Sequence, residues 1–249
     1  MSHLDHPLAD LYPRPEPGAR RAVGDYYESP AARSRKARWF IGLTIVANGV
    51  SVVLLGAQRA LLDQGAGNVA LSDWQRSEDR LALASFVELV VFIVAVVLFL
   101  RWLHLCYRNL LELGTKGLRF TPGWAVGYWF VPILNVVKPK QALDDLWRAT
   151  DVRVDDLSGP LKGLPSTSFV GWFWGLSIAA GVVAWTAIRL PSATVSNLET
   201  RNGGMIGGHL LQIAAGVCLF KLVGLLTARQ DARAAARAAA AAAAPVSFG

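Results

Sequence analysis

Four long apolar runs divide this chain of 249 residues, and most of its lysines and arginines lie on one side of them. An α-helix rises about 1.5 Å per residue, so roughly 20 apolar residues cross a hydrocarbon core of about 30 Å. Hydrophobic residues make up 53% of the chain and charged residues 17%, which leaves too little polar surface for a soluble protein with four such helices. The sequence therefore predicts an all-α integral membrane bundle of four transmembrane helices. They cover residues 39–57, 81–100, 168–188 and 205–226.

A fifth apolar stretch, residues 124–137, is shorter and has the sequence WAVGYWFVPILNVV. Apolar stretches of about 10–14 residues more often dip into the membrane or lie along it than cross it. Pro132 bends any helix in this stretch because it lacks a backbone donor. We therefore expect a re-entrant or interfacial element between the second and third helices, and a fifth span remains the alternative.

The distribution of basic residues decides between these topologies. If the fifth stretch does not cross the membrane, three groups of basic residues share one side. They precede the first span, flank the fifth stretch and follow the fourth span. A fifth span would divide them almost evenly, which the positive-inside rule disfavours. The prediction is a bacterial inner (plasma) membrane protein with both termini in the cytoplasm. Five arginines then lie outside: Arg59, Arg76, Arg80, Arg189 and Arg201.

The net charge of +7 indicates the expected partners. In a soluble protein such a charge would favour nucleic acid. Here the basic residues flank apolar runs, so membrane lipids with anionic headgroups are the expected partner, and nucleic acid is not expected. Glycines four residues apart, at Gly171 and Gly175 and at Gly204 and Gly208, let helices approach closely. This spacing favours a tight bundle and is compatible with a homo-oligomer.

Three regions follow from the composition. Residues 1–38 are polar and rich in proline, which predicts a disordered cytoplasmic arm. Residues 39–228 form the four-span membrane domain. Residues 229–249 form an Ala-rich cytoplasmic tail whose helix propensity extends the fourth span.

The segments on either side of the fifth stretch are predicted to be helical. Residues 101–113 continue the second helix beyond the membrane, and Gly114 is a plausible C-terminal cap. Residues 140–149 predict a short amphipathic helix on the membrane surface. Its adjacent carboxylates, Asp144 and Asp145, are expected to face water, because no water-activating partner is visible beside them.

Residues 101–150 hold the most specific pattern in the chain. Its characteristic positions are Trp102, Arg108, Asn109, Leu113, Gly114, residues 121–124, residues 129–132, Asn135, Lys138, Pro139, Gln141, Ala142, Leu146 and Trp147. In these positions the segment resembles a bacterial membrane-protein family called domain of unknown function 4328. It departs from the family at Lys140, where an aromatic residue is expected. The resemblance implies an integral membrane protein and implies no activity.

Polar side chains inside a bilayer are costly, so each is a candidate for function. Four of them are predicted to gather in the outer half of the bundle. One interpretation is a proton or cation site, and the other is hydrogen bonding between helices. The four residues are Asn48, Glu88, His209 and Gln212.

A second candidate lies at the inner face, around the fifth stretch. A re-entrant element needs polar groups that satisfy its backbone carbonyls, and Arg108, Asn109 and Asn135 suit that task. The alternative is a pocket for an anion or a lipid headgroup, which Arg108 and Lys138 favour. The full candidate set is Arg101, Arg108, Asn109, Trp124, Pro132, Asn135 and Lys138.

No catalytic, cofactor or metal motif is visible, so no cofactor and no enzymatic activity are expected. His104 and Cys106 are two residues apart and face different sides of a helix, and we expect Cys106 and Cys218 to be reduced thiols. The sequence favours a non-enzymatic scaffold or sensor that binds lipid or a partner protein at its cytoplasmic face. The alternative is a small oligomeric transporter or channel that uses a Glu88/His209 layer.

Overall fold

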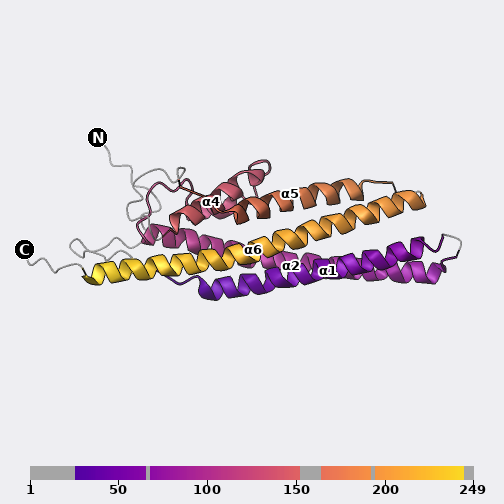
Figure 1. Ribbon diagram of the computed structural model, residues 1–249, viewed down its shortest axis with the longest axis horizontal. Helices are drawn as coiled ribbons and strands as arrows, with labels where there is room; N and C mark the ends of the chain where they lie inside the picture. Colours follow the sequence, from indigo (N-terminus) through magenta and orange to yellow (C-terminus); the bar gives the residue numbers. More distant parts are fainter. Residues whose placement is uncertain (1–25, 66–67, 152–163, 192–193, 244–249) are drawn as a thin grey trace, which may run out of the picture.

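The computed structural model describes residues 26–65, 68–151, 164–191 and 194–243, and these residues form helices and connecting turns without a strand (Figure 1). The helices are α1 (Ala31–Leu62), α2 (Leu71–Glu112), α3 (Pro122–Gly127), η2 (Leu134–Val136), α4 (Lys138–Ala149), α5 (Ser168–Ile188) and α6 (Val195–Ala243). This architecture confirms the predicted all-α fold.

Four of the described helices, α1, α2, α5 and α6, are long and apolar enough to cross a membrane. In each, no more than 28% of the most apolar stretch is buried inside the protein. A soluble protein would bury such stretches, whereas a membrane protein exposes them to lipid. The four helices therefore confirm the predicted membrane bundle.

The long helices pack in the order α2, α1, α6, α5. α2 and α5 are consequently the two edges of the arrangement. α3 packs against α2, and α4 packs against α5, so the segment between α2 and α5 connects these edges at one end of the bundle (Figure 1). The indole Nε1 of Trp174 in α5 donates a hydrogen bond of 2.8 Å to the carbonyl of Val136 in η2.

The same end of the bundle holds the start of α1, the end of α2, α4 and the last part of α6, and we call it the basic end (Figure 1). At the opposite end the chain passes from α1 to α2 and from α5 to α6, and we call this the loop end. α5 has 21 residues, which correspond to about 31 Å and match one hydrocarbon core. α6 has 49 residues, or about 74 Å, so it extends far beyond that thickness.

Local sequence explains where the helices near the basic end stop and start. Gly114 has a φ of 68°, and its left-handed conformation ends α2 as predicted. The amide of Thr115 then donates to the carbonyl of Leu110 at 2.9 Å. At the start of α3, the Thr121 hydroxyl accepts from the amide of Trp124, and Pro122 occupies the first turn.

The fifth apolar stretch contains no helix that could span the membrane. α3 has six residues and η2 has three, with a turn at Ile133, whose φ is 68°. Pro132 lies directly before this turn. The alternative of a fifth span is therefore wrong, and the choice between a re-entrant and an interfacial element stays a prediction.

One predicted region differs from the structure. Residues 31–38 were predicted to be disordered, but they form the first two turns of α1. Residues 26–30 are described as well, and residues 1–25 lie outside the described part of the chain. α6 continues without a break past residue 228 to Ala243, so the Ala-rich segment extends the fourth span as its helix propensity predicts.

Candidate functional site

Three of the four predicted intramembrane polar residues meet between α1, α2 and α6. His209 Nδ1 lies 2.9 Å from Asn48 Oδ1 and 3.6 Å from Glu88 Oε1. The Ser51 hydroxyl donates to Glu88 Oε2 at 2.9 Å. We call Asn48, Ser51, Glu88 and His209 the polar layer. Ser51 could have been found from the sequence, because it lies three residues after Asn48 on the same helix face.

The hydrogen bonds of Asn48 determine which nitrogen of His209 carries a proton. The Asn48 amide nitrogen donates to the carbonyl of Thr44 at 2.8 Å, so its amide oxygen faces His209. An amide oxygen only accepts, so His209 donates from Nδ1. The side chains of Glu88 and His209 are 20% and 17% exposed, so the layer is neither fully buried nor open.

A polar cavity of about 220 Å³ lies between the polar layer and the loop end, and His209 is among its lining residues. Its wall includes Gln58, which donates to Glu78 and accepts from Asn202 at 2.9 Å. Sequence reasoning missed these three residues because they lie at the ends of the apolar runs. The helical spacing of Asn48, Ser51 and Gln58 is a signal that would have found Gln58.

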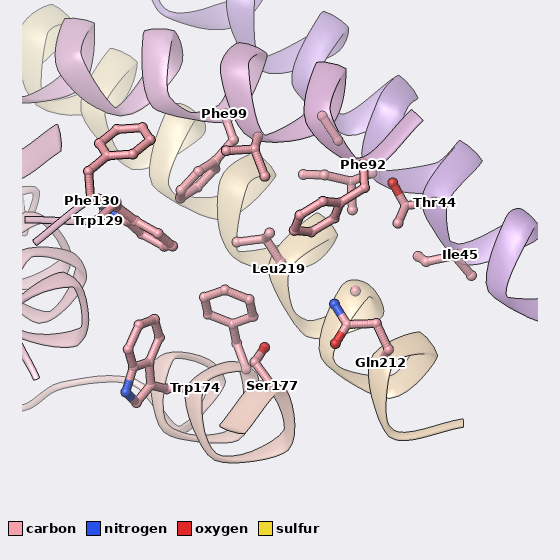
Figure 2. A pocket seen from close by; sticks show the side chains of 15 residues that line it. Thr44, Ile45, Phe92, Phe99, Trp129, Phe130, Trp174, Ser177, Gln212 and Leu219 are labelled. Atoms are coloured by element: carbon pink, nitrogen blue, oxygen red, sulfur yellow. The ribbon is translucent and has the colours of Figure 1, made fainter. Parts of the chain in front are cut away.

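Gln212 does not join the polar layer. Its side chain lines a larger cavity on the basic-end side of His209, and it has no hydrogen-bond partner among the described residues. This cavity has a volume of about 430 Å³ and lies between all four long helices (Figure 2). Trp129 and Phe130, from the segment after α3, border it. We call it the apolar groove, because most of its lining side chains are hydrocarbon.

At the basic end, Arg108 and Asn109 bind the segment that precedes α1. Arg108 Nη2 lies 2.8 Å from Glu28 Oε2, and Arg33 Nη2 lies 3.1 Å from Glu28 Oε1. The Asn109 amide donates to the carbonyl of Glu28 at 2.7 Å. The prediction that Arg108 and Asn109 hold the re-entrant element is therefore wrong. Arg108 binds the side chain of Glu28 and Asn109 binds its backbone, and Glu28 is far away in the sequence.

The other predicted inner residues do not form one pocket. Trp124 is 54% exposed and stacks on Tyr128, with ring centroids 4.9 Å apart. The Lys138 ammonium lies 5.7 Å from the ring centre of Phe120. Pro132 and Asn135 are exposed.

Arg101, in contrast, lies beside Arg33, whose guanidinium donates to the Arg101 carbonyl at 3.5 Å. This contact places the first turns of α1 next to the end of α2. Burial and the nearby charges of Arg108 and Arg33 lower the pKa of His104. We call Arg33, Arg101, His104 and Arg108 the basic patch.

The last part of α6 binds the other elements of the basic end through Gln230 and Arg233. Sequence reasoning did not predict these contacts. Gln230 is fully buried and donates to the carbonyl of Cys106 at 2.9 Å. Arg233 is also buried and donates to the Thr115 hydroxyl at 3.0 Å and to the carbonyl of Ala149. These contacts connect α6 to α2, to the loop after it and to α4.

The carboxylates predicted to face water are buried instead. Asp145 is 0% exposed and receives two hydrogen bonds from Arg119, one of them 2.7 Å long. Asp144 is 7% exposed, pairs with Lys140 at 2.8 Å and accepts from Ser166. The helix pattern alone did not predict this burial, because Arg119 and Ser166 come from segments outside α4.

α4 is correspondingly not a surface helix. It buries Pro139, Ala142, Leu143 and Leu146 as well as the two carboxylates. Within the described residues, no group of three His, Cys, Asp or Glu side chains could hold a metal ion. Cys106 and Cys218 are both free thiols.

Four lipid-exposed helices with a polar layer inside them define a multi-pass integral membrane protein. Residues 66–228 match the family model described as domain of unknown function (DUF4328), so the chain belongs to this family. No curated protein and no solved structure matches the chain.

Proposed function

We propose that this protein is a non-enzymatic membrane scaffold or sensor that binds anionic lipid headgroups at its basic end. In this proposal the basic end faces the cytoplasm of a bacterial inner membrane. The basic patch carries the proposal, because α1 and α2 bring their arginines together directly beyond their apolar stretches. Anionic headgroups lie at the same level of the membrane.

The Glu28 carboxylate, which already binds the basic patch, supports an anionic headgroup as the ligand. The Glu28 carboxylate binds Arg33 and Arg108 together. A lipid phosphate offers the same charge and the same oxygen acceptors. Arg101, Arg35 and Lys36 are exposed and form no ion pair with any described residue, so they remain available for a headgroup.

The hydrogen bonds that connect the helices at the basic end support a role as a scaffold. Buried hydrogen bonds from Asn109, Gln230 and Arg233 tie α2, α4 and α6 together. A lipid bound at the basic patch would therefore stabilise one connected body, and a partner protein could recognise that body.

The experiment compares phosphatidylglycerol with phosphatidylcholine by native mass spectrometry of the detergent-purified protein. A double variant, Arg33→Gln with Arg101→Gln, should weaken phosphatidylglycerol binding by roughly 30-fold, because each basic residue near an anionic surface contributes about 1 kcal/mol. Glu28→Gln should strengthen binding, since it removes the competing carboxylate.

The matched control is Arg76→Gln with Arg80→Gln, which removes two exposed arginines at the loop end. This control should leave phosphatidylglycerol binding unchanged. Equal affinity for both lipids in the wild-type protein, or equal loss in both double variants, would contradict the proposal.

A second candidate function is proton or cation transport through the polar layer. One observation favours it: the polar cavity at the loop end reaches His209, which lies next to Glu88. A carboxylate and an imidazole side by side are the groups that proton relays use.

The test is a pH-gradient assay in proteoliposomes. Glu88→Gln should abolish proton flux, while Glu78→Gln, in the wall of the polar cavity, should retain it. Absence of proton flux in the wild-type protein, under a membrane potential of either sign, would reject this candidate.

A further inference from the structure

We infer that the apolar groove between α2 and α5 binds the acyl chain of a membrane lipid. The inference concerns hydrocarbon inside the bilayer, so it does not depend on the headgroup proposal. It starts from the packing order of the helices, which leaves α2 and α5 as edges with the groove between them.

The groove lies at the depth of the hydrocarbon core. α5 has the length of one core, and its lining residues Phe173, Trp174 and Ser177 lie in the half nearer the basic end. Ser177 is nine residues from the start of α5, or about 14 Å along the helix axis. Acyl chains are the surrounding medium at this depth.

The groove is also open at its rim. Phe92 of α2 and Phe130 line it, yet they are 45% and 69% exposed. Figure 2 shows Phe92, Phe99, Trp129 and Trp174 around a common space, with Leu219 of α6 behind it. A volume of about 430 Å³ is within the range of sites that hold small organic ligands, roughly 300–1,000 Å³.

Two unpartnered polar atoms make the groove more than a bare apolar surface. The Ser177 hydroxyl oxygen and the Trp129 indole Nε1 are buried and have no hydrogen-bond partner among the described residues. Both residues line the groove. A buried donor without an acceptor is costly, and the ester carbonyl oxygens of a lipid are acceptors for Trp129, which contacts Trp174 and so lies nearer the basic end than Ser177.

Water and a second copy of the chain fit these observations less well. Water needs two to four polar partners in a cavity, and most of this lining is hydrocarbon. A helix of a second copy would bring backbone carbonyls that are already hydrogen-bonded within that helix.

The experiment uses a phosphatidylcholine that carries a photoactivatable diazirine on its acyl chain, in proteoliposomes of the full-length protein. After irradiation, adducts are mapped by peptide mass spectrometry. We expect adducts to concentrate on groove residues such as Phe99, Trp174 and Leu219. The zwitterionic headgroup keeps this result separate from the test of the basic patch.

Ser177→Phe fills the groove and should abolish the groove adducts. Ile178→Phe is the matched control, because the neighbouring side chain is 41% exposed and does not line the groove. Thr44→Phe fills the groove from α1, with Val46→Phe as its control, so the inference stays testable if one variant fails to fold. Size-exclusion profiles identify the folded variants.

Adducts distributed evenly over lipid-facing residues, or groove adducts that persist in both filling variants, would overturn the inference. Cysteine cross-linking of Phe92→Cys between two copies, together with absence of lipid adducts, would assign the groove to a dimer interface and would overturn it equally.

Discussion

At the scale of single residues, the stability of the basic end depends on charged side chains that are buried and bind polar groups of other segments. Arg233 is 3% exposed, and burial together with Arg237 lowers its pKa to about 10. It therefore remains protonated at neutral pH and donates to groups from two other segments. A buried charge costs desolvation energy, which good geometry and hydrogen bonds must offset.

Asp145→Asn should destabilise the protein by about 3 kcal/mol, because Arg119 loses the carboxylate that binds two of its nitrogens. Thermal unfolding in detergent measures the change. Asp73→Asn is the matched control, since Asp73 pairs with Arg76 on an exposed helix surface and should contribute about 0–1 kcal/mol. An equal shift in both variants would show that the burial of Asp145 has no energetic consequence.

His104 should make stability depend on pH. Its pKa in the folded protein lies below the ordinary 6.5, because of burial, of Arg108 on α2 and of Arg33 on α1. The unfolded chain then binds the proton more tightly, so stability is complete above about pH 6.5 and decreases as the pH falls below it.

Thermal unfolding of the wild type and of His104→Gln, each at about pH 7.5 and about pH 5, measures this effect. The wild type should lose more stability than the variant over this range. The Glu28 carboxylate faces the same arginines, so Glu28→Gln should lower the pKa of His104 further in an NMR titration. An unchanged pH dependence in His104→Gln would contradict the expectation.

At the scale of helices, small residues set the contact between α5 and α6. Cβ atoms added at Gly204 and Gly208 would lie 2.8 Å from Ala187 Cβ and 3.5 Å from Ala184 Cβ. The predicted close approach therefore occurs at this glycine pair. Gly175, in contrast, has nothing within 4 Å of an added Cβ and is exposed.

Gly204→Val should force α5 and α6 apart and destabilise the bundle by about 1–3 kcal/mol. Thermal unfolding in detergent again provides the measurement, and Gly175→Val is the control with open space around it. A Gly175→Val variant that unfolds as early as Gly204→Val would indicate that helix propensity, and not the contact with Ala187, determines the loss.

At the scale of the whole molecule, both described chain ends lie at the basic end, as an even number of spans requires (Figure 1). We expect this end in the cytoplasm, because it carries most of the basic residues.

Labelling of intact cells with a membrane-impermeant thiol reagent tests this orientation in single-cysteine variants. Asp63→Cys and Ser196→Cys, at the loop end, should react at once. Ser29→Cys and Ala240→Cys, at the basic end, should react only after permeabilisation. The reverse pattern would invert the orientation, and reaction of Ser29→Cys together with Ser196→Cys alone would contradict the paired spans.

The sequence predicted the apolar spans well because hydrocarbon thickness fixes their length. It also predicted that Asn48, Glu88 and His209 share one region, since each lies at a similar depth in its span. It failed for Gln212, because the direction of a side chain depends on how the helix is rotated in the bundle. It failed for Asp144 and Asp145 because their partners, such as Arg119 and Ser166, are distant in the chain.

The sequence by itself determined the class of protein, the four spans and the expected orientation, because hydropathy and charge act along the chain and need no tertiary contact. Tertiary structure alone decided that α2 and α5 form the edges of a groove and that α6 joins the basic end together. It also decided that Glu28 occupies the basic patch. These features arise from contacts between segments distant in the sequence, and no local pattern specifies such contacts.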